Sequence, residues 1–129
     1  MATYDQLMIY KQAYDLTTDL MPLTKSMDRG YKFTLGERIN NASVEMLLCV
    51  YRINITSGDR DRYFVSAREQ VELVRLLLRL MKDLRLVTTN RFTRLNESVE
   101  SISKQLTGWH RSSVDNTKKN GRLDQMRLF

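Results

Sequence analysis

The sequence is poor in the residues that interrupt secondary structure. Its 129 residues include five glycines and one proline. Because these two residue types mark most turns, a chain with so few of them has room for only a few long elements. Leucine, arginine and methionine, which are good helix formers, are plentiful. The sequence therefore predicts an all-α fold, at a length that suits a single domain with a real core.

Cysteine and histidine are equally scarce. Cys49 is the one cysteine, so no disulfide forms within a chain, which fits a reducing compartment; we expect the cytoplasm. The apolar run around Cys49 favours a structural thiol over a nucleophile. His110, the one histidine, is predicted to be a surface residue that binds no metal. The chain also lacks a glycine-rich phosphate loop and paired Glu-x-x-His motifs, so we expect no catalytic residues, no cofactor and no enzymatic activity.

Long apolar runs are absent as well. No stretch approaches the about 18 residues that a membrane-spanning helix needs, so a membrane partner is not expected. The first residues are charged and lack the apolar segment of a signal peptide.

Apolar residues at helical spacing predict four helices, near residues 3–27, 35–57, 63–87 and 91–111. Pro22 should kink the first helix or set its last turn apart. Thr34 and Glu37 have the spacing of a capping box at the start of the second. Asp59 or Asp61 can cap the third, and the polar residues 88–90 can end the third helix and cap the fourth.

Four amphipathic helices with short connections predict an antiparallel up-down-up-down bundle over residues 1–112. Residues 113–129 are polar and show no apolar period. We interpret them as a flexible basic C-terminal tail that is dispensable for folding.

The third helix carries more apolar surface than one core requires. One face is predicted to hold Ala67, Val71, Val74, Leu78 and Met81, and a second strip to hold Leu73, Leu77, Leu80 and Leu84. A helix that packs once against a core needs an apolar stripe a little over about 100° wide, and this helix has roughly twice that. The surplus predicts a homo-oligomer. The alternative is that this helix is simply central to its own bundle.

The positive charge is concentrated on the same helix and its flanks. The chain has a net charge of +6, and residues 59–94 contain nine basic against five acidic side chains. A basic ridge, made of Arg68, Arg75, Arg79 and Lys82, shares one narrow sector of the third helix, and Arg91 and Arg94 follow at the start of the fourth. Since arginine matches phosphate geometry, we predict that these six residues bind nucleic acid. The alternative is a solvated face, because Glu69, Glu72 and Asp83 lie beside the ridge and can pair with it.

Residues 31–39, YKFTLGERI, resemble the K-F-x-L-G-[ED]-R/Q signature of a family of small four-helix bundles. That family includes proteins encoded in intervening sequences of 23S ribosomal RNA genes and the accessory variability determinants of diversity-generating retroelements. Residues 10–27 look like its first helix with the late proline, and residues 77–112 look like its third-to-fourth helix joint with a final Gly-Trp. The resemblance covers roughly residues 5–112, and nothing carries over to the tail.

The arginine-rich third helix and the Gly-Trp ending are more similar to the retroelement branch. That resemblance implies a homopentameric barrel of bundles that binds the retroelement reverse transcriptase, its template RNA and the RNA/DNA duplex, and so supports mutagenic retrohoming. The alternative is a structural or protein-interaction bundle of the ribosomal-insert type, with no polymerase partner.

Overall fold

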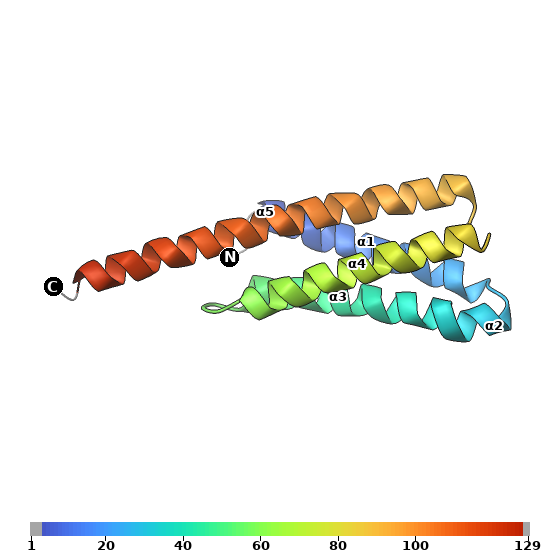
Figure 1. Ribbon diagram of the computed structural model, residues 1–129, viewed down its shortest axis with the longest axis horizontal. Helices are drawn as coiled ribbons and strands as arrows, with labels where there is room; N and C mark the ends of the chain where they lie inside the picture. The colour runs from blue at the N-terminus through green and yellow to red at the C-terminus, as the bar shows by residue number, and fades with distance from the viewer. Residues whose placement is uncertain (1–3, 128–129) are drawn as a thin grey trace.

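The computed structural model describes the backbone of residues 4–127 and the side chains of residues 6–116. In chain order its elements are α1 (Tyr4–Lys25), α2 (Arg29–Tyr31), the π-helical η1 (Lys32–Gly36), α3 (Glu37–Ile55), α4 (Asp61–Asp83) and α5 (Thr89–Arg127). The segments α2, η1 and α3 follow one another without a break, so the chain forms four long rods (Figure 1). No strand occurs in the described residues.

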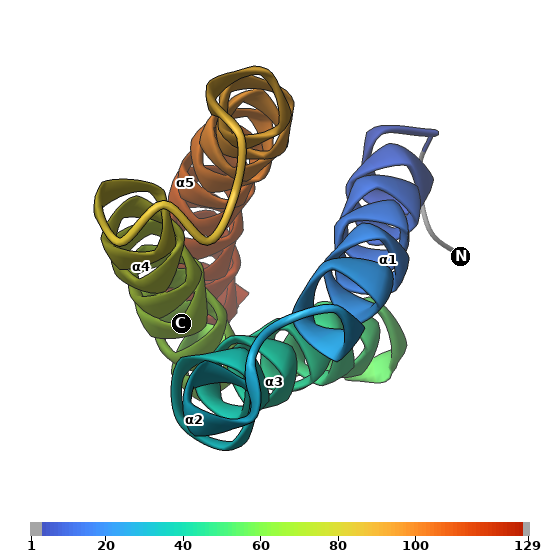
Figure 2. The ribbon, with the colours of Figure 1, turned by 90° about the vertical axis from the view of Figure 1, so that its right-hand side faces the viewer.

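Consecutive rods run antiparallel and close a four-helix bundle. Helix α1 packs on α3, α3 packs on α4, and α4 packs on α5; α5 returns to α1, where the packing is loosest (Figure 2). This arrangement confirms the predicted four-helix bundle. Because the connections are short, rods that follow one another in the sequence also lie side by side in space, as is usual for helix connections of about two to eight residues.

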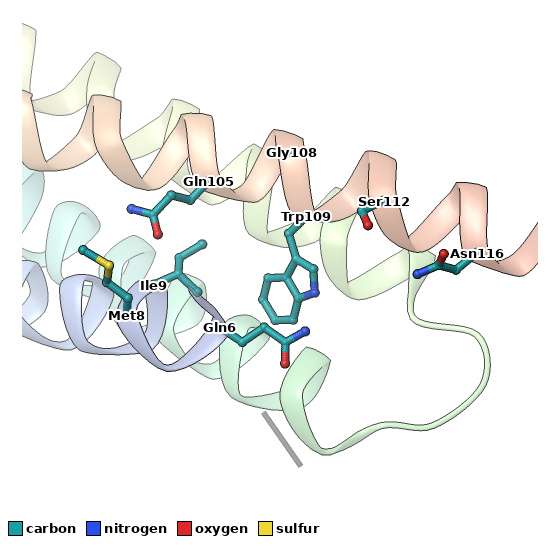
Figure 3. A pocket seen from close by; sticks show the side chains of 8 residues that line it. All are labelled: Gln6, Met8, Ile9, Gln105, Gly108, Trp109, Ser112 and Asn116. Carbon is teal, nitrogen blue, oxygen red and sulfur yellow. The ribbon is translucent and has the colours of Figure 1, made fainter. Parts of the chain in front are cut away.

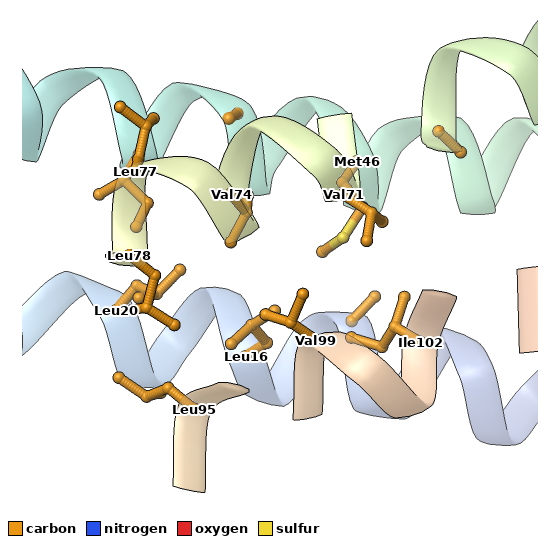
Figure 4. Close-up of a cluster of buried hydrophobic side chains, with 14 of the residues drawn as sticks. Leu16, Leu20, Met46, Val71, Val74, Leu77, Leu78, Leu95, Val99 and Ile102 are labelled. Atoms are coloured by element: carbon orange, nitrogen blue, oxygen red, sulfur yellow. The ribbon is translucent and has the colours of Figure 1, made fainter. Parts of the chain in front are cut away.

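The core is continuous along the bundle and is built from the faces that the apolar period predicted. In Figure 4, Val71, Val74 and Leu78 of α4 point between the other rods toward Leu16, Leu20, Met46, Val99 and Ile102. All five residues predicted for the inward face of α4 are buried, as are Leu95, Val99, Ile102 and Leu106 of α5. Each fully buried side chain of this size contributes about 1.5–3 kcal/mol relative to an exposed one, so these faces hold the bundle together.

The second rod begins earlier than predicted, and the capping box does not form. The rod starts at Arg29, and the amide of Lys32 donates to the Asp28 carbonyl at 2.8 Å. Thr34 therefore lies inside the rod, where its hydroxyl donates to the Gly30 carbonyl at 2.8 Å, as threonines within helices often do. Gly36 is buried, and a Cβ there would lie 3.3 Å from the Cβ of Thr24, so this glycine permits close packing of the second rod on α1.

Both ends of α4 differ from the prediction. Neither aspartate caps the helix: its N-cap is Arg60, without a side-chain cap bond, and the carboxylate of Asp59, one residue earlier, accepts the Asp61 amide at 3.0 Å. The other end stops at Asp83 rather than near residue 87, because Arg85 adopts a left-handed conformation with φ 62°. The amide of Arg85 donates to the Lys82 carbonyl at 3.0 Å, and that of Leu86 to the Met81 carbonyl at 2.8 Å. These bonds form a Schellman motif, which usually carries glycine at the position of Arg85.

Helix α5 is capped as predicted at its start but does not end where predicted. The Thr88 hydroxyl accepts the Arg91 amide at 3.2 Å. The predicted end at Arg111 is wrong, because the helix continues to Arg127. Residues 112–127 contain no proline, and the helix remains in contact with the α3–α4 connection, where Arg60 donates to the Ser113 hydroxyl at 3.1 Å. Contact with the α3–α4 connection and the absence of proline therefore let the helix continue through residues whose polarity indicated a tail.

Candidate nucleic-acid interface

The basic ridge runs along the seam between α4 and α5. Arg75 is its best-anchored member: its Nε donates to the Glu100 carboxylate of α5 at 2.9 Å, and its Nη1 pairs with Glu72 one turn earlier on α4. The hydrogen bond that Arg75 donates to Glu72 raises the pKa of Arg75 above its ordinary value, and the charge of Glu100 adds to this effect. Arg75 is therefore always charged and links α4 to α5 through its ion pair with Glu100.

The other ridge residues are held less tightly. The Nζ of Lys82 lies 4.8 Å from the centre of the Phe92 ring on α5. Arg79 reaches Asp83 at 3.6 Å, but its side chain remains 65% exposed. Arg68 is exposed and its Nη1 lies 3.2 Å from His110 Nδ1. An exposed ion pair is worth only about 0–1 kcal/mol, so a phosphate can compete with Asp83 for Arg79. Arg68 makes no ion pair among the described residues, so its charge is also available to a phosphate.

The pairing of the ridge was partly foreseen. Glu72 and Asp83 do pair with ridge arginines, as their position in the adjacent sector indicated. Glu100 was missed, because it comes from a different helix and only the packing of α5 on α4 brings it to Arg75. The structure therefore contains a basic ridge that is partly neutralised within the chain.

Arg91 and Arg94 do not join the ridge. Arg91 reaches across to α1, where its Nη2 donates to the Asp19 carbonyl at 3.3 Å, while the adjacent Phe92 contacts Lys82 of α4. Neighbouring residues on a helix point about 100° apart, so Arg91 lies on a different flank of α5 from the ridge. Arg94 is exposed, and among the described residues its guanidinium has no ion pair.

His110 is not the surface residue that the sequence predicted. Its side chain is only 13% exposed and stacks on Phe64, with ring centres 4.7 Å apart. Arginine can only donate hydrogen bonds, so His110 Nδ1 accepts from Arg68, and Nε2 donates to the Asp61 carboxylate at 2.7 Å. The prediction failed because α5 packs over the start of α4, which no local pattern shows.

Arg60 also lies at the end of the bundle that contains His110. The guanidinium of Arg60 lies 5.8 Å from the Phe64 ring centre and 5.9 Å from that of Trp109. It also donates to the Ile53 carbonyl at 3.2 Å, so Arg60 joins α3, α4 and α5. A cavity of about 690 Å³ lies beside it, between the α3–α4 connection and α5. No cluster of metal-binding side chains occurs here or elsewhere among the described residues.

A further cavity, of about 610 Å³, lies between α1 and α5 where these helices pack loosely. Figure 3 shows Met8 and Ile9 of α1 facing Gln105, Gly108 and Trp109 of α5 across it. Among the described residues, its lining contains no titratable side chain. These residues offer shape and hydrogen bonds to an occupant.

Apolar side chains form two stripes on the outside of the bundle. On α4 Leu76 and Leu80 are exposed, together with Leu84 at its C-cap and Val65 near its start. The predicted second strip is thus exposed in part: Leu80 and Leu84 are exposed, Leu73 is half-buried and Leu77 is buried. On α3 a second stripe was missed: Val44, Leu48, Tyr51 and Ile55 are exposed at spacings of four, three and four. That spacing was the signal that could have revealed it. Such contiguous exposed apolar surface is typical of contact sites.

The fold and these surfaces define a class: a small basic four-helix bundle with apolar stripes on the outside. The chain belongs to the bAvd-like family, whose model matches residues 7–113. This match confirms the resemblance noted in the sequence and covers all four rods, ending within α5. The family is an accessory type of all-helical domain and is not a known family of enzymes. The search of curated proteins found no significant match.

In the part of the chain that the structure describes, no helix combines the length and apolar character needed to span a bilayer.

Proposed function

We propose that this chain is a non-catalytic accessory protein of a diversity-generating retroelement, which binds the reverse transcriptase and the template RNA or cDNA and supports mutagenic retrohoming in the cytoplasm. Membership of the bAvd-like family over residues 7–113 carries this proposal.

The basic ridge is the proposed contact with nucleic acid. Arg68 and Arg79 supply exposed guanidinium groups, and Arg75 joins α4, which carries the ridge, to Glu100 of α5. Arg94 extends the basic surface on a separate flank, together with the half-buried Arg91. Contacts of this kind are made to phosphate and read no base sequence, so we expect RNA and RNA/DNA duplexes to bind through charge.

Self-association follows from the two apolar stripes. The stripes lie on neighbouring helices, α3 and α4, and their burial would remove large leucine, valine, isoleucine and tyrosine side chains from water. A ring of five copies, the number implied by the family resemblance, would repeat the ridge in every subunit. Weak phosphate contacts would then add up through avidity.

The binding of structured RNA at several salt concentrations tests this proposal. Replacement of Arg68, Arg75, Arg79 and Lys82 by Gln should weaken binding and reduce the slope of log affinity against log salt by about 0.9 for each duplex phosphate that the variant no longer neutralises. A control with the same change of charge replaces Lys11, Arg38, Arg62 and Lys104, which are exposed and lie outside the ridge. Because Arg75 also joins two helices, a second variant changes only Arg68 and Arg79.

A different candidate is a protein-interaction bundle of the ribosomal-insert type. The pairing of Arg75 with Glu72 and Glu100 favours it, since a ridge that neutralises itself needs no polyanion. Wild-type protein that assembles but does not bind RNA at low salt would support this alternative, as would ridge and control variants with the same salt slope.

A further inference from the structure

The turn between the first two rods exposes two aromatic rings. Phe33 of η1 is 60% exposed and Tyr31 of α2 is 38% exposed. A large apolar ring held on the surface at the tip of a bundle contributes little to the core, so its role is to be sought in an interaction.

Cationic groups surround the Phe33 ring. The guanidinium of Arg29 lies 6.0 Å from its centre and the Nζ of Lys32 lies 5.8 Å away, both at the outer limit of a cation–π contact. Lys25, at the end of α1, lines the same shallow hollow of about 310 Å³ as Lys32 and Phe33. The ring thus stays open while three positive charges stand around it.

Further positive charge gathers at this end of the bundle. The antiparallel rods bring the end of α4 and the start of α5 to the end of the molecule that carries α2 (Figure 1). The basic side chains that lie here are Lys25, Arg29, Lys32, Arg85, Arg91 and Arg94. The acidic residues at this end are Asp28, which precedes α2, Glu37, which lines the hollow, Asp83, which ends α4, and Asp19, whose carbonyl accepts from Arg91. The six basic residues outnumber these four acidic ones, so this end attracts a polyanion.

We propose that Phe33 and Tyr31, with Lys25, Arg29 and Lys32, form a platform for unpaired bases of single-stranded RNA or cDNA. Exposed aromatic rings interleaved with cations are the arrangement by which proteins hold single strands, because bases stack on the rings while phosphates meet the charges. The basic ridge lacks this feature, since its one ring, Phe92, is half-buried and packed against the core. The ridge therefore suits duplex and the platform suits unpaired bases.

This inference rests on the nucleic-acid binding proposed above but uses a different surface, so the two can fail separately. A second copy of the chain is the competing occupant of an exposed ring. Charge complementarity favours nucleic acid, because two copies meeting at this end would bring like charges together.

The test compares the binding of two fluorescent single-stranded oligonucleotides of equal length and charge, one with bases and one abasic. Wild-type protein should bind the first more tightly. Phe33→Leu keeps an apolar side chain but removes the ring, and should weaken binding of the base-containing strand by at least about fivefold while leaving the abasic strand unchanged. Tyr14→Leu is the matched control, because Tyr14 is 50% exposed near the middle of α1 and belongs to neither apolar stripe. The double variant Lys25→Gln with Lys32→Gln should weaken the binding of both oligonucleotides.

Three results would overturn the platform. Equal binding of both strands by wild type, with structured RNA still bound through the ridge, would remove the platform alone. Unchanged affinity of Phe33→Leu for the base-containing strand would do the same. A change in the mass of the assembly caused by Phe33→Leu, measured by light scattering, would assign the ring to an interface between copies. Failure of wild type to bind any nucleic acid would reject both the platform and the proposed function.

Discussion

Replacing Arg85 by glycine should stabilise the protein. Arg85 adopts φ 62° at the end of α4, and its side chain is exposed, with no hydrogen bond or ion pair among the described residues. A left-handed conformation costs an L-residue about 1–2 kcal/mol, which glycine avoids. Glycine in turn loses more backbone freedom on folding, by about 0.5–1 kcal/mol. The net gain should therefore be about 0.5–1 kcal/mol.

Urea unfolding at a fixed protein concentration measures this gain. The midpoint should rise at an unchanged m-value, and the melting temperature should rise by about 2–4 °C for a chain of this length. Arg85→Ala is the control: it removes the guanidinium but keeps the Cβ, so stability should stay near wild type. If Arg85→Gly gives no gain, or if the alanine variant gains as much, the left-handed residue is not the source of strain and the Schellman motif is wrongly assigned.

Three further predictions concern α5 and its contacts. Gly108→Ala should stabilise by about 1 kcal/mol in urea unfolding, since a Cβ there meets nothing within 4 Å and alanine is the better helix former; a decrease in stability would mean that this site is tighter than described. Phe64→Ala should destabilise by about 3–5 kcal/mol, because Phe64 is fully buried beneath Trp109 and His110; a destabilisation below about 1 kcal/mol would contradict that packing. Deletion of residues 117–129 should lower the helical circular dichroism signal without changing the melting temperature. Deletion from Ser113 onward should lower both, because it also removes the hydrogen bond between Arg60 and Ser113.

Periodicity predicted the parts of the fold that burial decides. Val71, Val74 and Leu78 recur at helical spacing because they face one core, and all three are buried. Local capping motifs were less reliable, because several compete. Thr34 has the spacing of a cap, yet the rod begins at Arg29 and takes Thr34 into its interior. The left-handed Arg85 gave no signal in the sequence, since glycine is the residue that usually marks that position.

The candidate site shows the same division. The charges of the ridge could be predicted from the spacing of Arg68, Arg75, Arg79 and Lys82 on one helix. Their partners could not, because Glu100 comes from α5 and is placed by packing between helices. His110 illustrates this most clearly: the sequence shows an isolated histidine, and only the crossing of α5 over α4 brings it between Asp61 and Arg68.

The most direct test of the proposed function is cDNA synthesis by the reverse transcriptase of the same retroelement on its own template RNA, with and without this protein. We predict that cDNA forms only when the protein is present, and that protein, enzyme and RNA elute together. The ridge variant, with Arg68, Arg75, Arg79 and Lys82 replaced by Gln, should lose most of this activity. The charge-matched control should retain it. Equal cDNA yield without the protein, together with separate elution of protein and enzyme, would contradict the account and leave a bundle with some other partner.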